Sequence, residues 1–77
     1  MKKHCYFIIH EPKSWNWLDC GECESIKEAR EYMERVYTGV LMVVYDSREA
    51  VGDCPLDIYK IGKGKAYRVK DWDAVGF

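Results

Sequence analysis

The sequence has little of what marks membrane, secreted or nucleic-acid-binding proteins. No segment approaches the ~20 consecutive apolar residues that a membrane-spanning helix needs. The apolar stretch near the N-terminus is closed by His10, Glu11 and Pro12, so it is too short for a signal peptide. The formal net charge is only −1, so no overall field favours nucleic acid, an anionic membrane or an acidic substrate. These features predict a cytoplasmic protein without a membrane partner.

What is present is the composition of a small globular protein. The chain has 77 residues, of which 48% are hydrophobic and 32% are charged, and this predicts one folded domain over residues 1–77. A chain of this length rarely has room for a catalytic cleft between two lobes. The cytoplasm keeps thiols reduced, so the four cysteines do not by themselves indicate a disulfide framework.

Several segments have the pattern of β-strands. Residues His4–His10 predict a first strand, with apolar side chains pointing to both faces. Val40–Tyr45 is an unbroken apolar run, which is typical of a strand buried on both faces. Leu56–Ile61 and Ala66–Lys70 predict an antiparallel hairpin around the turn at 62–64.

One helix is strongly indicated between the first two of these strands. Ser25 and Glu28 have the spacing of a capping box, which places the start of the helix directly after Ser25. Gly39 is placed to adopt the left-handed conformation that ends a helix. The apolar residues that recur at helical spacing between these limits are Ile26, Ala29, Met33 and Val36.

The order of these elements, β-α-β-β-β, predicts an α+β fold in which one helix packs on a mixed sheet of three to four strands. A right-handed crossover would make the strands at 4–10 and 40–45 parallel, with residues 11–24 as a long connection. One helix covers only one face of a sheet. The other face would then be closed by the loop carrying Trp15 and Trp17 together with the C-terminal tail, or by another molecule.

The motif Cys20-Gly21-Glu22-Cys23 lies between the first strand and the helix. This arrangement, with Pro55 before a later strand, resembles the thioredoxin and glutaredoxin families. The resemblance implies a dithiol oxidoreductase in which Cys20 is the nucleophile and Cys23 resolves the mixed disulfide.

Two other interpretations of the cysteines remain open. C-x-x-C supplies two ligands of a tetrahedral zinc site, and the best complete set would be Cys20, Cys23 and Cys54 with His10 or Cys5. The motif is also compatible with a purely structural loop, because cysteine is among the residue types most often buried. In that interpretation no metal or other cofactor is needed.

The charged residues from Ile58 to Lys70 are all basic, and two glycines flank Lys63 in the turn of the predicted hairpin. A P-loop requires a helix after its glycines, and here a strand is predicted. Tyr59 and Tyr67 could stack on bases beside these positive charges. Acidic residues flank the hairpin, however, so nucleic acid is not the favoured partner.

No Ser-His-Asp or paired-carboxylate constellation can be assembled from the sequence, which favours a protein that is not an enzyme. We therefore expect a small non-enzymatic protein-binding module, an inhibitor or adaptor of the style encoded by phages and mobile elements, that occupies a surface of a larger protein. Self-association of the same surface into a homodimer is the closest variant. The residues predicted to make the contact are Trp15, Trp17, Met42, Val44, Trp72 and Phe77.

Overall fold

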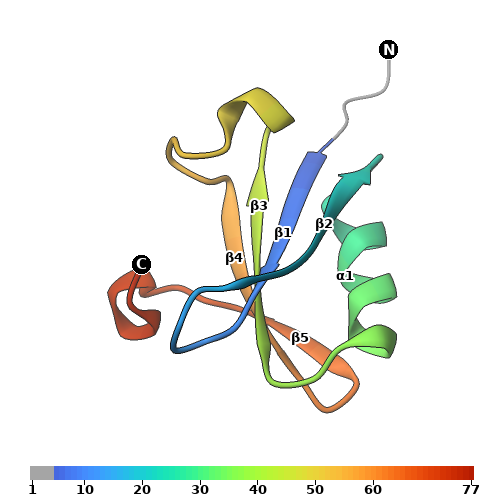
Figure 1. Ribbon diagram of the computed structural model, residues 1–77. Coiled ribbons are helices and arrows are strands. Elements are labelled where there is room, and N and C mark those ends of the chain that lie inside the picture. Colours follow the sequence, from blue (N-terminus) through green and yellow to red (C-terminus); the bar gives the residue numbers. More distant parts are fainter. Residues whose placement is uncertain (1–4) are drawn as a thin grey trace.

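The computed structural model describes residues 5–77 and shows a five-stranded sheet with one helix packed against it (Figure 1). The strands are β1 (Cys5–His10), β2 (Trp17–Cys23), β3 (Val40–Tyr45), β4 (Asp57–Gly62) and β5 (Lys65–Arg68). The helices are α1 (Ile26–Val36) and two short 3-10 turns, η1 (Arg48–Ala50) and η2 (Trp72–Val75). His4, the predicted first residue of β1, lies outside the described residues. Within the part of the chain described, no helix has both the length and the apolar character needed to cross a membrane.

The sheet is antiparallel throughout, with the strand order β2-β1-β3-β4-β5. The expectation of a mixed sheet of three to four strands is therefore wrong. Residues 17–23, expected to be part of a connection, instead form β2, which folds back on β1. Because β2 and β3 both run antiparallel to β1, they are parallel to each other, and α1 connects them. The parallel crossover exists, but β1 is inserted between its two strands.

The predicted helix is confirmed together with its cap. The Glu28 backbone N–H donates to Ser25 Oγ over 3.1 Å, so the first turn has a side-chain acceptor for one of its free donors. Ala29 and Met33 are buried on the face that meets the sheet. The helix ends at Val36 with Tyr37 as its extended C-cap, so Gly39 does not itself end the helix as predicted; its φ of 73° lies two residues later, in the turn that leads to β3.

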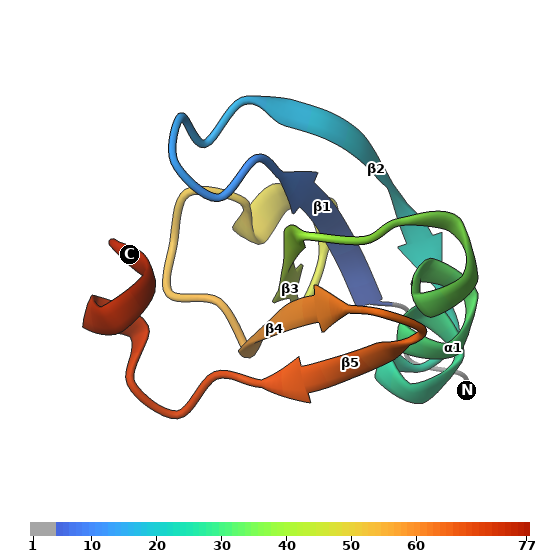
Figure 2. The same ribbon diagram turned by 90° about the horizontal axis from the view of Figure 1, so that it is seen from below.

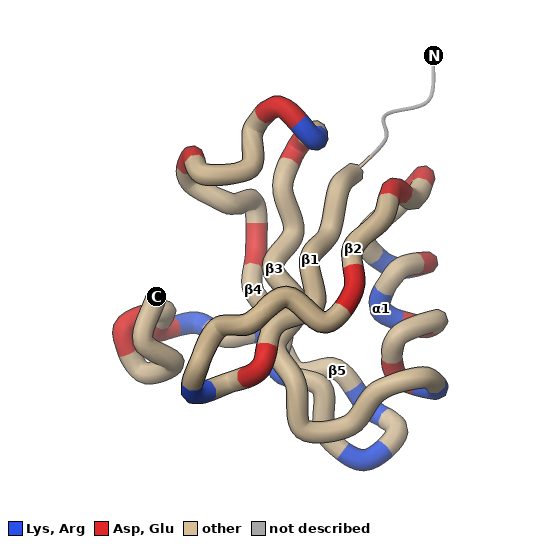
Figure 3. The backbone as a smooth tube through the Cα atoms, in the orientation of Figure 1, with Lys and Arg blue, Asp and Glu red and all other residues tan. Residues whose placement is uncertain are grey.

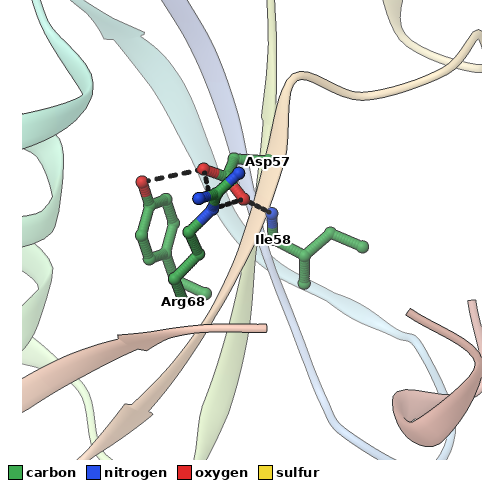
Figure 4. Close-up of polar contacts among 4 residues, drawn as sticks. Asp57, Ile58 and Arg68 are labelled. Atoms are coloured by element: carbon green, nitrogen blue, oxygen red, sulfur yellow. Dashed lines mark hydrogen bonds and ion pairs between the residues drawn. The ribbon is translucent and has the colours of Figure 1, made fainter. Parts of the chain in front are cut away.

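The predicted hairpin is also confirmed, as β4 and β5. A carboxylate braces its open end, where Asp57 Oδ1 accepts the Ile58 N–H over 3.0 Å and Oδ2 accepts the Tyr59 hydroxyl over 3.1 Å (Figure 4). Arg68 Nε lies 3.1 Å from the same Oδ2, which ties β5 to β4 across the pair.

Both faces of the sheet are covered, so every residue of β3 is buried. On one face α1 covers a cluster comprising Phe7, Ile9, Ala29, Met33, Val40, Met42, Val44, Tyr59 and Ile61. On the other face Tyr6, Ile8, Val43, Tyr45 and Ile58 form a second cluster, against which Trp15, Ala50, Val51, Val69 and Trp72 pack. These last five residues belong to loops and to the C-terminal segment, which lie on the side of the sheet away from α1 (Figure 2). The chain therefore seals its own second face, and no other molecule is needed to complete the core.

Candidate functional site

Four of the six predicted partner-binding residues gather at one end of the sheet. We call the group formed by Trp15, Trp17, Trp72, Phe77 and His10 the aromatic end. The ring centroids of Trp15 and Phe77 lie 5.5 Å apart, and those of Trp72 and Phe77 lie 5.9 Å apart. The His10 ring lies 5.1 Å from Trp15 and 6.1 Å from Trp17. These distances lie within the range of favourable aromatic pairs, so the five rings form one continuous cluster.

A tight loop between β1 and β2 positions the two tryptophans. The Trp15 N–H donates to the Glu11 carbonyl over 3.0 Å, and the Glu11 carboxylate accepts hydrogen bonds from Ser14 and Asn16. Trp15 itself has a φ of 59°, which is unusual for a residue other than glycine and costs ~1–3 kcal/mol. The surrounding hydrogen bonds and the packing of the indole therefore hold Trp15 in a conformation that it would not adopt alone.

The C-terminal segment supplies the other half of the aromatic end. Asp71 caps η2 by accepting the Asp73 N–H, and the Phe77 N–H donates to the Trp72 carbonyl over 3.0 Å. Gly76 has a φ of 82°, and a Cβ atom at this position would lie 3.6 Å from Trp15 Nε1. The turn at Gly76 thus brings Phe77 back against the Trp15 ring.

The rings of the aromatic end differ in their exposure. Trp15 and Trp72 pack against the second-face cluster and are partly buried. Trp17 is 58% exposed and Phe77 is 44% exposed, although both touch other rings. The aromatic end therefore exposes the large apolar side chains of Trp17 and Phe77 to solvent, while Trp15 and Trp72 pack against the core.

Met42 and Val44, the other two predicted contact residues, are fully buried. Both point from β3 into the cluster beneath α1, so neither is accessible to a partner. This part of the prediction is wrong because it assumed that β3 had an uncovered face, whereas the chain covers both faces.

His10 is buried at the centre of the aromatic end, with 6% of its surface exposed. Its Nδ1 lies 3.2 Å from the Trp15 carbonyl oxygen, which can only accept a hydrogen bond, so Nδ1 carries the proton. Burial lowers the pKa of His10, an effect that the Trp15 carbonyl partly opposes. Sequence reasoning considered His10 as a zinc ligand and missed this role. No local sequence signal indicates this role, because it depends on the loop bringing the Trp15 carbonyl oxygen back to the imidazole.

The structure does not bring Cys20 and Cys23 together. Both lie on β2, three residues apart, so their side chains point to opposite faces. The thioredoxin-like arrangement of a strand, a C-x-x-C loop and a helix is therefore absent from this segment. The peptide bond before Pro55 is trans, as are all the peptide bonds of residues 5–77. Gly21 of the motif lies in β2 opposite Phe7, whose ring occupies the space above it.

The predicted zinc ligands do not come together as a set, although Cys5 lies opposite Cys23. Cys54 is exposed in the loop before β4, and His10 lies at the opposite end of β1 from the strand end that pairs with Cys23. Among residues 5–77 no group of three or more histidine, cysteine or acidic side chains could hold a metal ion.

The two edge strands of the sheet, β5 and β2, differ in whether another element of the chain bonds to their outer side. At the β5 edge, Glu34 of α1 accepts the Ala66 N–H over 3.1 Å. β2 is the other edge strand, and its side chains are mostly exposed. Asp19 and Glu22 make this edge acidic (Figure 3).

A cavity of about 330 Å³ lies between β2 and α1, and residues of both elements line it.

The basic hairpin offers less to a nucleic acid than its sequence indicates. Tyr59 is 5% exposed and packs in the core beneath α1, so it cannot stack on a base. Tyr67 is exposed, and Lys65 Nζ lies 5.8 Å from the centre of its ring.

No protein-family model, curated protein or solved structure significantly matches the chain.

Proposed function

We propose that this protein is a small non-enzymatic binding module, an inhibitor or adaptor, that occupies a surface of a larger protein through its aromatic end. The observation that supports this proposal is the exposure of two rings that already pack on other rings: Phe77 contacts Trp15 and Trp72, and Trp17 contacts His10. Tryptophan is among the residue types most enriched at binding hot spots. Rings that already contact one another lose little conformational freedom on binding, which favours affinity.

The edge strand beside Trp17 indicates how a partner would continue the contact. Trp17 is the first residue of β2, and no strand within residues 5–77 pairs with the outer edge of β2. An extended segment of the partner can add to such an edge through backbone hydrogen bonds. Because Asp19 and Glu22 are acidic, a partner segment carrying lysine or arginine fits this edge better than an acidic one.

The same charges argue against a homodimer through β2. In registers that set Asp19 opposite Asp19 or Glu22 opposite Glu22, antiparallel pairing of β2 with a second copy would oppose like charges, which is unfavourable. A different, basic protein is therefore the favoured partner.

A photo-crosslinking amino acid at Trp17 tests the proposal, with the same substitution at Tyr67 as the matched control. The two residues are 58% and 54% exposed, but Tyr67 lies on β5 at the other edge of the sheet. We expect one cellular protein to crosslink at position 17 and not at position 67. Its affinity, measured by calorimetry on the purified pair, should fall at least ~30-fold with Trp17→Ala. Tyr67→Ala should change it less than ~3-fold.

Three results would contradict the proposal. The first is a partner that binds Trp17→Ala and Phe77→Ala as tightly as the original chain. The second is a partner whose binding is lost only with Tyr67→Ala. The third is sedimentation of the pure protein as a dimer that Trp17→Ala dissociates, which would assign the aromatic end to self-association. Circular dichroism confirms in each case that the variants fold.

A further inference from the structure

Cys5 and Cys23 lie directly opposite each other in the antiparallel pairing of β1 and β2. Opposed residues in such a ladder have Cα atoms about 4.5 or 5.5 Å apart, depending on whether the pair exchanges hydrogen bonds. Both values fall within the ~4.4–6.8 Å that a disulfide bridges. The register therefore sets the two backbones at a separation that a disulfide can span.

The two side chains also share one face and one environment. Both are partly buried, and both pack against the cluster beneath α1. Cys23 Sγ lies 3.2 Å from the Ser25 carbonyl oxygen. Burial raises the pKa of Cys23, and the neighbouring Cys5 thiol and the Glu28 carboxylate raise it further. The effect of Cys5 on Cys23 agrees with the proximity that the register requires.

The other cysteines are poor partners for this pair. Cys20 lies opposite Ile8, on the face of β2 away from Cys23 and about 10 Å from it along the strand. Cys54 is exposed in the loop before β4. Of the pairings open to Cys23, the one with Cys5 needs the least movement of the backbone.

We propose that Cys5 and Cys23 form a cross-strand redox site, which a low-molecular-weight disulfide such as oxidised glutathione converts reversibly into an intramolecular disulfide. One protein thiolate attacks the glutathione disulfide, forms a mixed disulfide and releases one reduced glutathione. The second protein thiol loses its proton, attacks the protein sulfur of the mixed disulfide and releases the other glutathione. The protein loses two protons and two electrons, which glutathione disulfide takes up, and two molecules of reduced glutathione are formed.

The bond would join β1 to β2 at the end of the pair remote from the aromatic end, since His10 and Trp17 pair at the other end. It would close a loop over residues 5–23 and so restrict the unfolded chain. The oxidised protein is therefore expected to unfold about 10 °C higher than the reduced protein.

The test equilibrates the full chain with mixtures of reduced and oxidised glutathione, followed by acid quenching, trypsin digestion and mass spectrometry. Cleavage after Lys3, Lys13 and Lys27 places Cys5 in peptide 4–13, and both cysteines of the C-x-x-C motif in peptide 14–27. We expect these two peptides to be linked by a disulfide, with fragmentation assigning the bond to Cys23. Cys20→Ser and Cys54→Ser should form the same link, and Cys23→Ser should not.

Several outcomes would overturn the inference: glutathione adducts alone, a bond from Cys5 to Cys20, bonds only between chains, or no disulfide at any glutathione ratio. Because the peptide map is made on the original chain, it does not depend on whether a cysteine variant folds. The site is also distant from the aromatic end. A failure here would therefore leave the Trp17 experiment unaffected, and the converse also holds.

Discussion

At the scale of single residues, His10 connects the core to the exposed part of the candidate site. It is buried, its Nδ1 bonds the Trp15 carbonyl, and its ring contacts both Trp15 and Trp17. A change in the charge of His10 would therefore act on both tryptophans at once. No other described histidine is available to share this role, since His4 lies outside the described residues.

We predict that the stability of the protein falls as the pH drops below about 6.5, the ordinary pKa of histidine. Burial lowers the pKa of His10 in the folded state, so the unfolded chain takes up the proton first. The loss of stability therefore begins near the unfolded pKa and continues until the pH has passed the folded pKa, below which it levels off. Urea unfolding at a series of pH values between about 7.5 and 5 measures this dependence.

His10→Gln is the control for this prediction, because glutamine can still donate to the Trp15 carbonyl but does not titrate. The carboxylates are the same in both proteins, so the difference between the two pH profiles isolates His10. Identical profiles would show that His10 is not the group responsible.

The residues of the aromatic end were predictable only in part. Trp15, Trp17, Trp72 and Phe77 were chosen because large aromatic side chains in loops must either pack or bind, and they do gather. His10 was not chosen, because nothing local to the sequence shows that the loop after it returns its own carbonyl oxygen to the imidazole.

At the scale of elements, the start of α1 is the feature best specified by local sequence. We predict that Ser25→Ala lowers the free energy of unfolding by ~1 kcal/mol, because the Glu28 N–H loses its side-chain acceptor. Ser47→Ala is the matched control, since Ser47 precedes η1 without a side-chain cap bond. That variant should change stability by less than ~0.5 kcal/mol. Equal losses in the two variants, measured by urea unfolding, would contradict the capping role.

The elements that were predicted correctly each contain a sequence pattern typical of their secondary structure, whereas β2 contains none. The α1 helix has a cap and helical periodicity, β3 has an unbroken apolar run, and the hairpin of β4 and β5 has a glycine turn. The side chains of β2 are mostly exposed, so its sequence shows no alternation of apolar and polar residues. Its strand conformation comes from pairing with β1, a tertiary effect that overrides local propensity.

At the scale of the whole molecule, both faces of the sheet carry a cluster of buried apolar side chains. We predict that Met42→Ala, beneath α1, and Ile58→Ala, beneath the loops, each lower the free energy of unfolding by ~2–5 kcal/mol. Both side chains are fully buried, although only one of them lies under a helix. Chemical denaturation of the two variants measures the losses.

Leu56→Ala serves as the control for this comparison, because Leu56 is 49% exposed. It should cost less than ~1 kcal/mol. A small effect of Ile58→Ala, close to that of Leu56→Ala, would mean that the loops do not seal the second face in solution.

The topology could not be predicted from the order of elements alone. The rule for crossover connections applies to β2 and β3, but β2 was not recognised, and the rule was applied to β1 and β3 instead. The same omission hid the pairing of Cys5 with Cys23, which follows from the register of β1 on β2. One unrecognised strand thus accounts both for the wrong sheet and for the overlooked position of Cys5 opposite Cys23.

The position of β1 inside the sheet has a consequence for synthesis of the chain. Of the described strands β1 comes first along the chain, yet its second neighbour, β3, follows only after β2 and the whole of α1. During synthesis one edge of β1 therefore has no strand to pair with until β3 has also emerged from the ribosome.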